Sequence, residues 1–388
     1  MKISHLFVLL GMLAIFLWFM EHERAQKITP SGSKIKVGII APFSGDAQGK
    51  GMRGLRGIKI SQALQPYLDN GDAIELIEVD NQENPKKSIE ALRVLTEEHK
   101  VAAILMFSGS DSALAVAKVA DNYKTPILAL FASHPDITKF SSFVNQFNFD
   151  DTFQASVAAL YVRDELLIDK VAIMTQPDNV HFSYLTNKFS EQFIAADGEI
   201  TDTIYLIENK HDFVNILGEM KKSDPGLLYL PVDIDNLFDI KIALAKLGWN
   251  PAIMVSDGIM ANVKAQTTYP LHLLDGTLTI DTFAYDRNFT EFGEKVLEQM
   301  DLMGFSIEET GTDSALGAEG YGLLIHVMNQ CLLPNNNIQV CINDAIRSTI
   351  RFEGVKGAFS FDATGKAQRS LMINRVNAGQ MEFIVQVY

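Results

Sequence analysis

Short apolar runs rich in β-branched residues alternate with longer amphipathic stretches along most of the chain. The runs predict strands at 34–40, 74–79, 102–107, 126–130, 170–175, 227–232 and 252–256. The amphipathic stretches predict helices at 51–68, 86–98, 113–123, 152–167 and 183–196. Strands that alternate with helices form βαβ units, and nearly continuous apolar strands are covered on both faces of their sheet. The pattern therefore predicts an α/β fold of doubly wound parallel sheets.

The alternation is interrupted once, after the first four predicted strands. The stretch "SSFVNQFNFDDTF", residues 141–153, mixes aromatic and polar residues before a new helix and strand begin. We interpret this stretch as a crossing from one lobe to a second. No segment is rich in proline or serine like a flexible linker, so the two lobes are expected to be joined closely.

The N-terminus differs in kind from the rest of the chain. Leu6 to Met20 carries no charge and no proline, and Lys2 and His5 precede it, which is the pattern of an export signal. The residues after Met20 are bulky and charged, unlike a cleavage site, and the segment is short for a membrane span of about 20 residues. Residues 1–26 are predicted to be a signal peptide or an uncleaved membrane anchor. A buried core helix is the third alternative.

Charge and cysteine content narrow the class of protein. Acidic residues outnumber basic ones by 48 to 33, and we find no basic stripe, which argues against a nucleic-acid partner. Cys331 and Cys341 enclose a turn-rich loop, "LLPNNNIQV". An exported protein can form a disulfide there, and two buried free thiols are the alternative. We disfavour zinc at this cysteine pair.

A glycine motif follows the first predicted strand. Gly49-x-Gly51-x-x-Gly54 has the spacing of a dinucleotide-binding fingerprint, and Asp80 follows at the end of the next apolar run. That fingerprint needs its first glycine at the strand end, whereas residues 41–48 separate Ile40 from Gly49. We interpret the stretch as a wide loop followed by a helix start that needs flexible backbone.

Motifs of common enzymes are missing from the sequence. It contains no His-Glu-x-x-His, no Gly-x-Ser-x-Gly and no Gly-x-x-x-x-Gly-Lys-(Ser/Thr) motif, and its eight histidines do not pair at metal-ligand spacing. The sequence therefore predicts a protein that is not an enzyme and has neither a cofactor nor a bound metal.

Several segments, in order, match a known family. These are "KIKVGIIAPFSGDAQGKGMRGLRGIKIS", "VDNQENPKKSIEALRVL", "AAILMFSGSDSALAVAKVADNYKTPILALFASHP", "VSDGI" and "TIRFEGVKGAFSFDATGKA". Together they cover roughly residues 34 to 385. The series resembles type I periplasmic solute-binding proteins of the leucine/isoleucine/valine-binding group.

The resemblance implies a ligand site between two lobes, with its first anchors in lobe one. Ser108, Gly109 and Ser110 follow the third strand, where a hydroxyl and the N–H groups of a helix start suit a carboxylate. A simple helix cap is the alternative for Ser110. Phe131, Ala132 and Ser133 follow the fourth strand, at the family's second anchor.

The resemblance places further ligand-binding residues in lobe two. Phe182 stands where amino-acid binders often have a tyrosine, so it can stack but has no hydroxyl. Asp233 follows another strand and faces the cleft or solvent. Asp257 matches the acid that amino-acid binders place against the ligand ammonium, or it only forms a turn with Gly258.

The resemblance also implies a domain plan and a function. Lobe one is expected to comprise residues 34–148 and 283–356, and lobe two residues 149–282 and 357–388. Closure of the lobes over a small polar solute, an amino acid or related compound, would deliver it to the membrane permease of an ABC-type transporter. The location would be periplasmic or extracytoplasmic, on the inner membrane if the N-terminal segment is uncleaved. A tethered ligand sensor acting through a partner protein and a non-binding scaffold are the alternatives.

Overall fold

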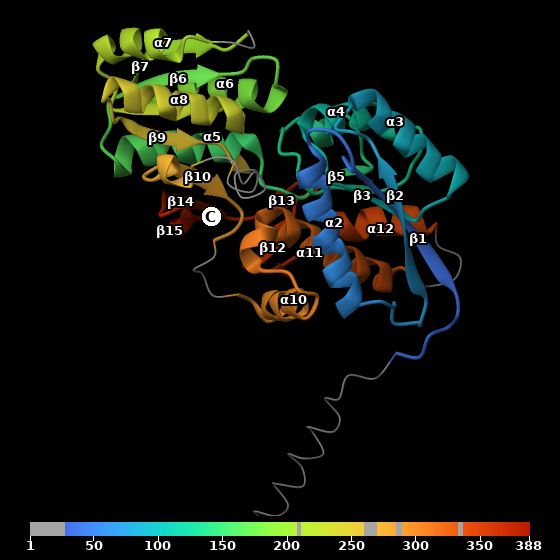
Figure 1. Cartoon of the computed structure of the whole chain (residues 1–388). Coiled ribbons are helices and arrows are strands. Elements are labelled where there is room, and N and C mark those ends of the chain that lie inside the picture. Colours follow the sequence, from blue (N-terminus) through green and yellow to red (C-terminus); the bar gives the residue numbers. More distant parts are fainter. Residues whose placement is uncertain (1–27, 208–210, 260–269, 285–288, 333–336) are drawn as a thin grey trace, which may run out of the picture.

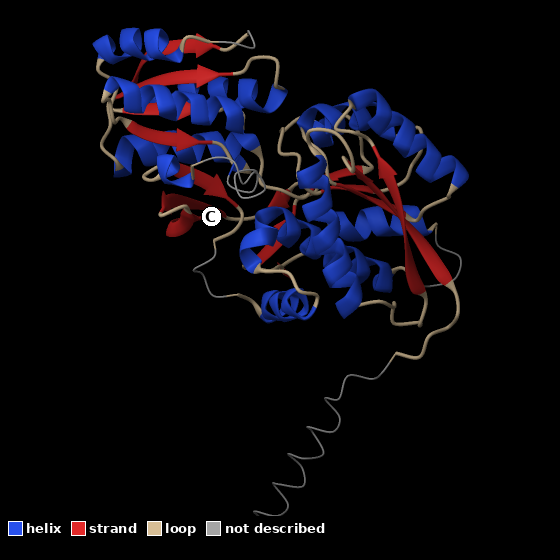
Figure 2. Ribbon diagram, in the orientation of Figure 1, coloured by secondary structure: helices blue, strands red, loops and turns tan. Residues whose placement is uncertain are grey.

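The computed structural model describes residues 28–207, 211–259, 270–284, 289–332 and 337–388, which form two lobes (Figure 1). In each lobe a central sheet is flanked by helices (Figure 2). The predicted signal peptide or anchor at residues 1–26 lies outside the described residues. Within the described ranges, no helix is long and apolar enough to cross a membrane.

Lobe one is built on a parallel sheet of five strands in the order β2-β1-β3-β4-β5. These strands are β1 (Lys34–Ala41), β2 (Ala73–Asp80), β3 (Ala103–Met106), β4 (Ile127–Ala129) and β5 (Val144–Gln146). Residues of α2 (Gln48–Leu64), α11 (Ile307–Gln330) and α12 (Ile338–Arg347) pack on one face. Residues of α3 (Pro85–Arg93) and α4 (Ser110–Ala120) pack on the other. Both faces of the strands are therefore covered, as their continuous apolar runs predict.

Lobe two contains a seven-stranded sheet in the order β15-β14-β10-β9-β8-β6-β7. Its strands are β6 (Lys170–Thr175), β7 (Glu199–Tyr205), β8 (Leu227–Leu230), β9 (Ala252–Val255), β10 (Leu278–Asp281), β14 (Leu371–Asn377) and β15 (Gln380–Val387). Residues of α5 (Asp151–Leu160) and α6 (Val180–Ala195) pack on one face, and those of α7 (Phe213–Met220) and α8 (Ile234–Leu247) on the other.

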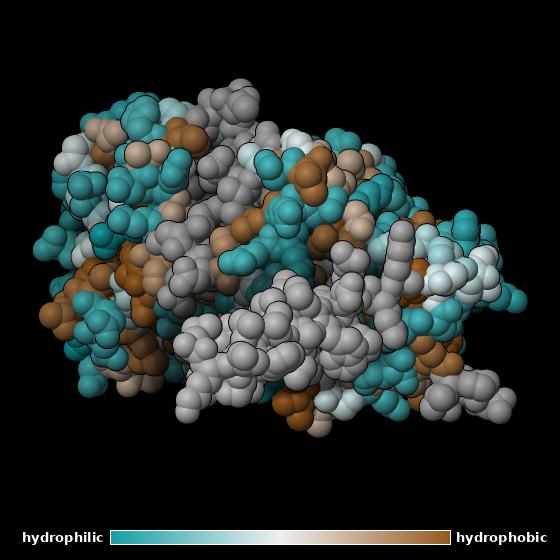
Figure 3. Space-filling view, turned by 90° about the horizontal axis from the view of Figure 1, so that it is seen from below, coloured by the Kyte–Doolittle hydropathy of each residue, from teal (hydrophilic) through white to brown (hydrophobic). Residues whose placement is uncertain are grey.

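Smaller elements complete the chain. A three-stranded sheet comprises β11 (Phe352–Glu353), β12 (Ala358–Phe361) and β13 (Ala367–Gln368), and α10 (Glu291–Leu302) lies in the same part of the molecule (Figure 1). Helical turns follow at Val94–Glu98, Ile137–Lys139, Tyr161–Glu165, Lys221–Ser223 and Leu271–Leu274. Seen from below, the face outside the atoms drawn in grey mixes hydrophilic residues with smaller hydrophobic groups (Figure 3).

All seven predicted strands and all five predicted helices are present, with ends that differ by a few residues. The α/β fold with two lobes is confirmed. One feature differs, because β14 and β15 form an antiparallel hairpin and make the second sheet mixed. Ala378 and Gly379 join these strands with positive φ at both residues, as a two-residue hairpin turn requires.

The chain connects the two sheets through residues 147–150, again after Asp281, and finally through residues 368–371. Phe359, Phe361 and Ala367 pack in the lobe-one core together with Phe147. The lobe boundaries stay a prediction, but these contacts favour a last crossing after Gln368 rather than at residue 356.

The glycines of α2 allow close packing instead of supplying backbone freedom. A Cβ on Gly51 would lie 2.0 Å from the carbonyl oxygen of Pro42, and a Cβ on Gly57 would lie 1.9 Å from that of Ser314 in α11. Neither glycine has a positive φ. Our expectation of a helix start that needs flexible backbone is therefore wrong, because what this helix needs at these positions is the absence of a side chain.

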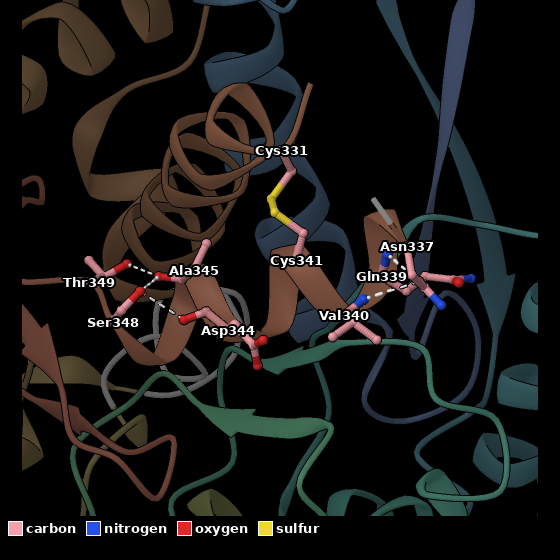
Figure 4. The surroundings of a disulfide bond; sticks show 9 residues. All are labelled: Cys331, Asn337, Gln339, Val340, Cys341, Asp344, Ala345, Ser348 and Thr349. Carbon is pink, nitrogen blue, oxygen red and sulfur yellow. Dashed lines mark hydrogen bonds between the residues drawn. A yellow bond between two sulfur atoms is a disulfide. The ribbon is translucent and has the colours of Figure 1, made fainter. Parts of the chain in front are cut away.

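The two cysteines form a disulfide that ties the end of α11 to α12 (Figure 4). Cys331 follows the last residue of α11, and Cys341 lies in the first turn of α12. Asn337 caps α12, because its side-chain oxygen accepts hydrogen bonds from the N–H groups of Gln339 and Val340. Of the two alternatives left open by the sequence, the structure contains the disulfide.

Candidate functional site

A cavity of about 550 Å³ lies where the strand-end loops of the two lobes meet. In lobe one it is lined by residues that follow β1, β2, β3 and β4, and in lobe two by residues that follow β6, β8 and β9. All of these loops leave the carboxyl ends of parallel strands, which is where open α/β sheets bind their ligands.

Eight of the nine predicted ligand-binding residues line this cavity: Gly109, Ser110, Phe131, Ala132, Ser133, Phe182, Asp233 and Asp257. Ser108 is not among the lining residues. It is fully buried, and its hydroxyl accepts a hydrogen bond of 2.8 Å from the side-chain amide of Asn81. The structure therefore does not bring Ser108 to the cavity, because its polar atom is used to join two loops of lobe one.

His181 is the centre of an ion-pair network in the cavity wall. Its Nδ1 lies 3.0 Å from Asp151 Oδ2, and its Nε2 lies 3.3 Å from Asp257 Oδ1. Asp151 is completely buried, whereas the His181 side chain is 17 % exposed. Burial opposes a charge on His181, but the two carboxylates outweigh burial and raise the pKa of His181 to about 10. His181 is therefore an imidazolium at neutral pH, hydrogen-bonded to Asp151 through Nδ1 and within ion-pair distance of Asp257 at Nε2.

A second ion pair lies on the lobe-one side of the cavity. Lys50 Nζ is 2.9 Å from Glu83 Oε2 and lies 4.6 Å from the ring centroid of Phe131. The other carboxylate oxygen, Glu83 Oε1, accepts a hydrogen bond from the N–H of Gly109. Gly109 is the N-cap of α4, so a carboxylate of the protein itself lies beside the start of this helix.

Two further acids are held by backbone and amide donors. Burial raises the pKa of Asp111 of lobe one, and the nearby N–H of Val180, the first residue of α6 in lobe two, opposes this shift. Asp233 caps α8, and its Oδ2 accepts a 2.7 Å hydrogen bond from the side-chain amide of Gln176. The sequence left open whether Asp233 faces the cleft, and it lines the cavity.

The lobes touch each other across the cavity. Ser133 Oγ of lobe one lies 3.3 Å from His181 Nδ1 of lobe two. Gly258 has a positive φ, and a Cβ there would lie 3.3 Å from the Phe131 ring. The rings of His134 and Tyr184 are 4.9 Å apart in an edge-to-face arrangement. The Asp257-Gly258 turn therefore serves two purposes, because it turns the chain and brings lobe two against lobe one.

Several lining residues were not predicted from the sequence. They are Asp46, Ala47, Lys50, Glu83, Asp111, Asn179, His181, Ile234, Asp235, Gly258 and Ile259. A weak signal was available, because each follows the end of an apolar strand run within about ten residues. The sequence gives no signal that Lys50 pairs with Glu83 or that His181 pairs with Asp257.

A second cavity, of about 610 Å³, lies beside the hinge. Its lining includes Asp150 and Lys366, whose side chains form a 2.8 Å ion pair, and Arg369. None of the predicted site residues lines it, and its walls come from the hinge segments instead of strand-end loops. The cavity between the strand ends is therefore the stronger candidate for the functional site.

Comparison with known proteins agrees with this geometry. Residues 34–380 match the family model described as periplasmic binding protein. An amino acid binding protein of Pseudomonas aeruginosa is 22% identical over 286 residues, which cover 71% of this chain and 73% of that protein. Membership of this family implies an extracytoplasmic location.

Solved structures share the fold. The leucine binding protein LivK of Thermotoga maritima superposes with a TM-score of 0.81 at 22% identity, covering 91% of this chain and 98% of that one. A solute binding protein of R. palustris in complex with 4-hydroxybenzoate gives a TM-score of 0.79 at 20% identity, covering 92% and 97%. The chain belongs to the periplasmic binding protein family and has the two-lobed type I fold that it shares with these solved structures.

Proposed function

We propose that this protein binds a small polar solute, an amino acid or a related compound, outside the cytoplasm and delivers it to an ABC-type transporter. The observation that carries this proposal is the cavity at the strand ends, which both lobes line. A molecule held there touches Ser110 and Phe131 of lobe one and Phe182 and Asp257 of lobe two.

The mechanism is closure of the lobes around the solute. A ligand shifts an equilibrium between open and closed forms only by its differential affinity for them. Contacts with both walls exist only in the closed form, so they favour closure. The contacts of Ser133 with His181 and of Phe131 with Gly258 close the same interface without a ligand and lower the cost of closing.

A thermal-shift screen of the full chain tests the binding function. The probes are α-amino acids, small amides, carboxylates, amines and urea, each at about 1 mM. A ligand with a dissociation constant near 1 μM then adds about 4 kcal/mol to the stability, which raises the unfolding temperature by several degrees. A flat response from folded protein would favour the non-binding scaffold.

Variants connect a hit to the cavity. Phe182→Ala removes an aromatic wall and is expected to abolish most of the shift, whereas Phe140→Ala, at a 46% exposed site outside the cavity, leaves it unchanged. Uptake of the same compound by cells that lack the protein separates delivery from sensing. Reduced uptake supports delivery to a transporter, and normal uptake supports the sensor.

A further inference from the structure

We propose that the solute is an organic cation without a free carboxylate, such as an amine, a polyamine or a guanidino compound. This inference rests on the proposed function and narrows its ligand. It starts from the charges that line the cavity. Six lining residues are acidic: Asp46, Glu83, Asp111, Asp233, Asp235 and Asp257. The cationic side chains among the described lining residues are Lys50 and His181.

Both cations are already neutralised by the protein. The Lys50 ammonium pairs with Glu83 at 2.9 Å, and the His181 imidazolium lies between Asp257 of the lining and the buried Asp151 behind it. A ligand carboxylate entering the cavity would have to displace one of these pairs. Breaking either pair would leave a poorly solvated carboxylate behind, which is costly.

Carboxylates of the protein also lie at helix starts beside the cavity. A helix N-terminus attracts anions through its free N–H groups. At α4 the N–H of Gly109 donates to Glu83, and at α8 the N–H of Asn236 donates to Asp233. A carboxylate of the protein therefore lies beside each of these two helix starts and disfavours a second carboxylate there.

The remaining two helix starts offer little more to an anion. At α6 the side chain of Asn179 accepts from the N–H groups of His181 and Phe182, and the carboxylate of Asp111 lies near that of Val180. At α2 no side chain caps the start, but the N–H of Gln48 donates to the carbonyl of Gly45. Asp46 adjoins this start and repels an anion there.

The acids repel one another as well as an anionic ligand. Burial, together with the neighbouring charges of Asp233 and Asp239, raises the pKa of Asp235. A cation bound among these acids relieves that repulsion, because an opposite charge within a few ångströms favours the ionised carboxylate. The excess of acids therefore selects the sign of the ligand's charge.

Aromatic rings in the cavity wall suit the same ligand. Phe131 and Phe182 line the cavity, and the ammonium of Lys50 already lies 4.6 Å from the Phe131 ring centroid. Aromatic faces attract ammonium and guanidinium groups, more strongly when these are desolvated. Two rings beside the carboxylates of Asp46, Asp111 and Asp233 give an organic cation both an apolar contact for its carbon frame and a counter-charge for its nitrogen.

The test compares ligands that share a carbon frame but differ in charge. Binding of putrescine, 1,4-butanediol and succinate to the full chain is measured by titration calorimetry, with agmatine, leucine and benzoate as further probes. We expect putrescine or agmatine to bind at least about tenfold more tightly than succinate and leucine, and more weakly as salt shortens the Debye length from about 30 Å at 0.01 M to about 8 Å at 0.15 M.

The outcomes separate this inference from the proposed function. Binding of leucine or benzoate without binding of the amines overturns the cation and leaves the solute-binding function standing. Binding of the diol as tightly as the diamine also overturns the cation, because charge would then contribute nothing. Failure of every probe to bind counts against both proposals.

Variants that replace an acid by its amide test which carboxylates of the cavity attract the cation. Asp111→Asn keeps an oxygen that can accept from the N–H of Val180 and removes the charge, and Asp46→Asn removes an exposed charge at the cavity rim. Each is expected to weaken putrescine binding by roughly two- to fivefold, the range of a solvent-accessible charge pair. Glu298→Gln, on the exposed surface of α10, is the matched control and should leave binding unchanged. Unchanged affinity in both aspartate variants, with folding intact, would overturn the inference.

Discussion

The imidazolium of His181 donates to the buried carboxylate of Asp151 across 3.0 Å, and this contact joins the first turns of two helices, α6 and α5. Asp151 is completely buried, so this ion pair lies in the interior of lobe two. On its other side His181 reaches Asp257 of the cavity wall. The pair therefore belongs both to the packing of lobe two and to the surface that a solute would meet.

The first prediction concerns this pair and pH. Because the pKa of His181 is raised from 6.5 to about 10 in the folded protein, its stabilising effect is complete below about pH 6.5 and is lost as the pH rises through about 10. His181→Gln should lower the free energy of unfolding by about 3 kcal/mol at pH 6 and by progressively less towards pH 10. Urea unfolding across this range measures the difference. His272→Gln, at an exposed site, is the control, and a loss independent of pH would contradict the assignment.

The buried acid Asp281, at the end of β10, gives a prediction of opposite sign: replacing it with a neutral residue should stabilise the protein. Burial raises the pKa of Asp281 to about 7, although Thr312 donates a 2.7 Å hydrogen bond to it. Its contribution to stability is complete below pH 3.8 and is lost as the pH rises through about 7. Asp281→Asn should therefore raise the unfolding temperature by several degrees at pH 8, worth about 2 kcal/mol, and change little at pH 4. Asp301→Asn, at an exposed site, is the control. Equal effects of Asp281→Asn at both pH values, or an effect no larger than that of the control, would contradict the claim that the ionised Asp281 carboxylate destabilises the fold.

The close contact between α2 and α11 can be tested with one methyl group. A Cβ on Gly57 would lie 1.9 Å from the Ser314 carbonyl oxygen, whereas a Cβ on Gly218 in α7 meets nothing within 4 Å. Gly57→Ala should destabilise the protein by about 2 kcal/mol or more, because the helices must separate. Gly218→Ala should stabilise it by roughly 0.5–1 kcal/mol through helix propensity. Thermal unfolding of the two variants compares them, and the same sign for both would refute the packing argument.

A buried ion pair joins the same two helices. Arg53 Nη2 lies 2.7 Å from Asp313 Oδ2, and both side chains are more than nine-tenths buried. Arg53→Met leaves a buried carboxylate without this partner and should cost about 3–5 kcal/mol. The double variant Arg53→Met/Asp313→Leu should cost clearly less than the two single variants added together. Additive losses in chemical unfolding would show that the two side chains do not act as a pair.

The local sequence predicts most of this fold because the buried positions of each segment form a regular pattern of apolar residues. The runs that became β1, β3, β6 and β8 are apolar on both faces, and they were recognisable alone. β7, "EITDTIY", is half-exposed at the edge of its sheet, and β5 has three residues, two of them polar. Neither strand therefore has a continuous apolar run that would predict it from the sequence. The hairpin of β14 and β15 joins β10 only through contacts between residues about a hundred positions apart.

The candidate site was likewise predictable from the sequence only in part. The family resemblance pointed to Gly109, Ser133 and Asp257 from the sequence, and they line the cavity because ligands of open α/β sheets bind at the carboxyl ends of parallel strands. The charge of the cavity was decided by the tertiary structure alone. Glu83, after β2, reaches Gly109, after β3, across 26 positions because β1 alone separates these strands in the sheet, and His181 of α6 reaches Asp151 of α5 across 30 because the two helices pack side by side. Periodicity is a property of one segment, whereas an ion pair depends on which segments, distant in the sequence, the fold of each lobe places side by side.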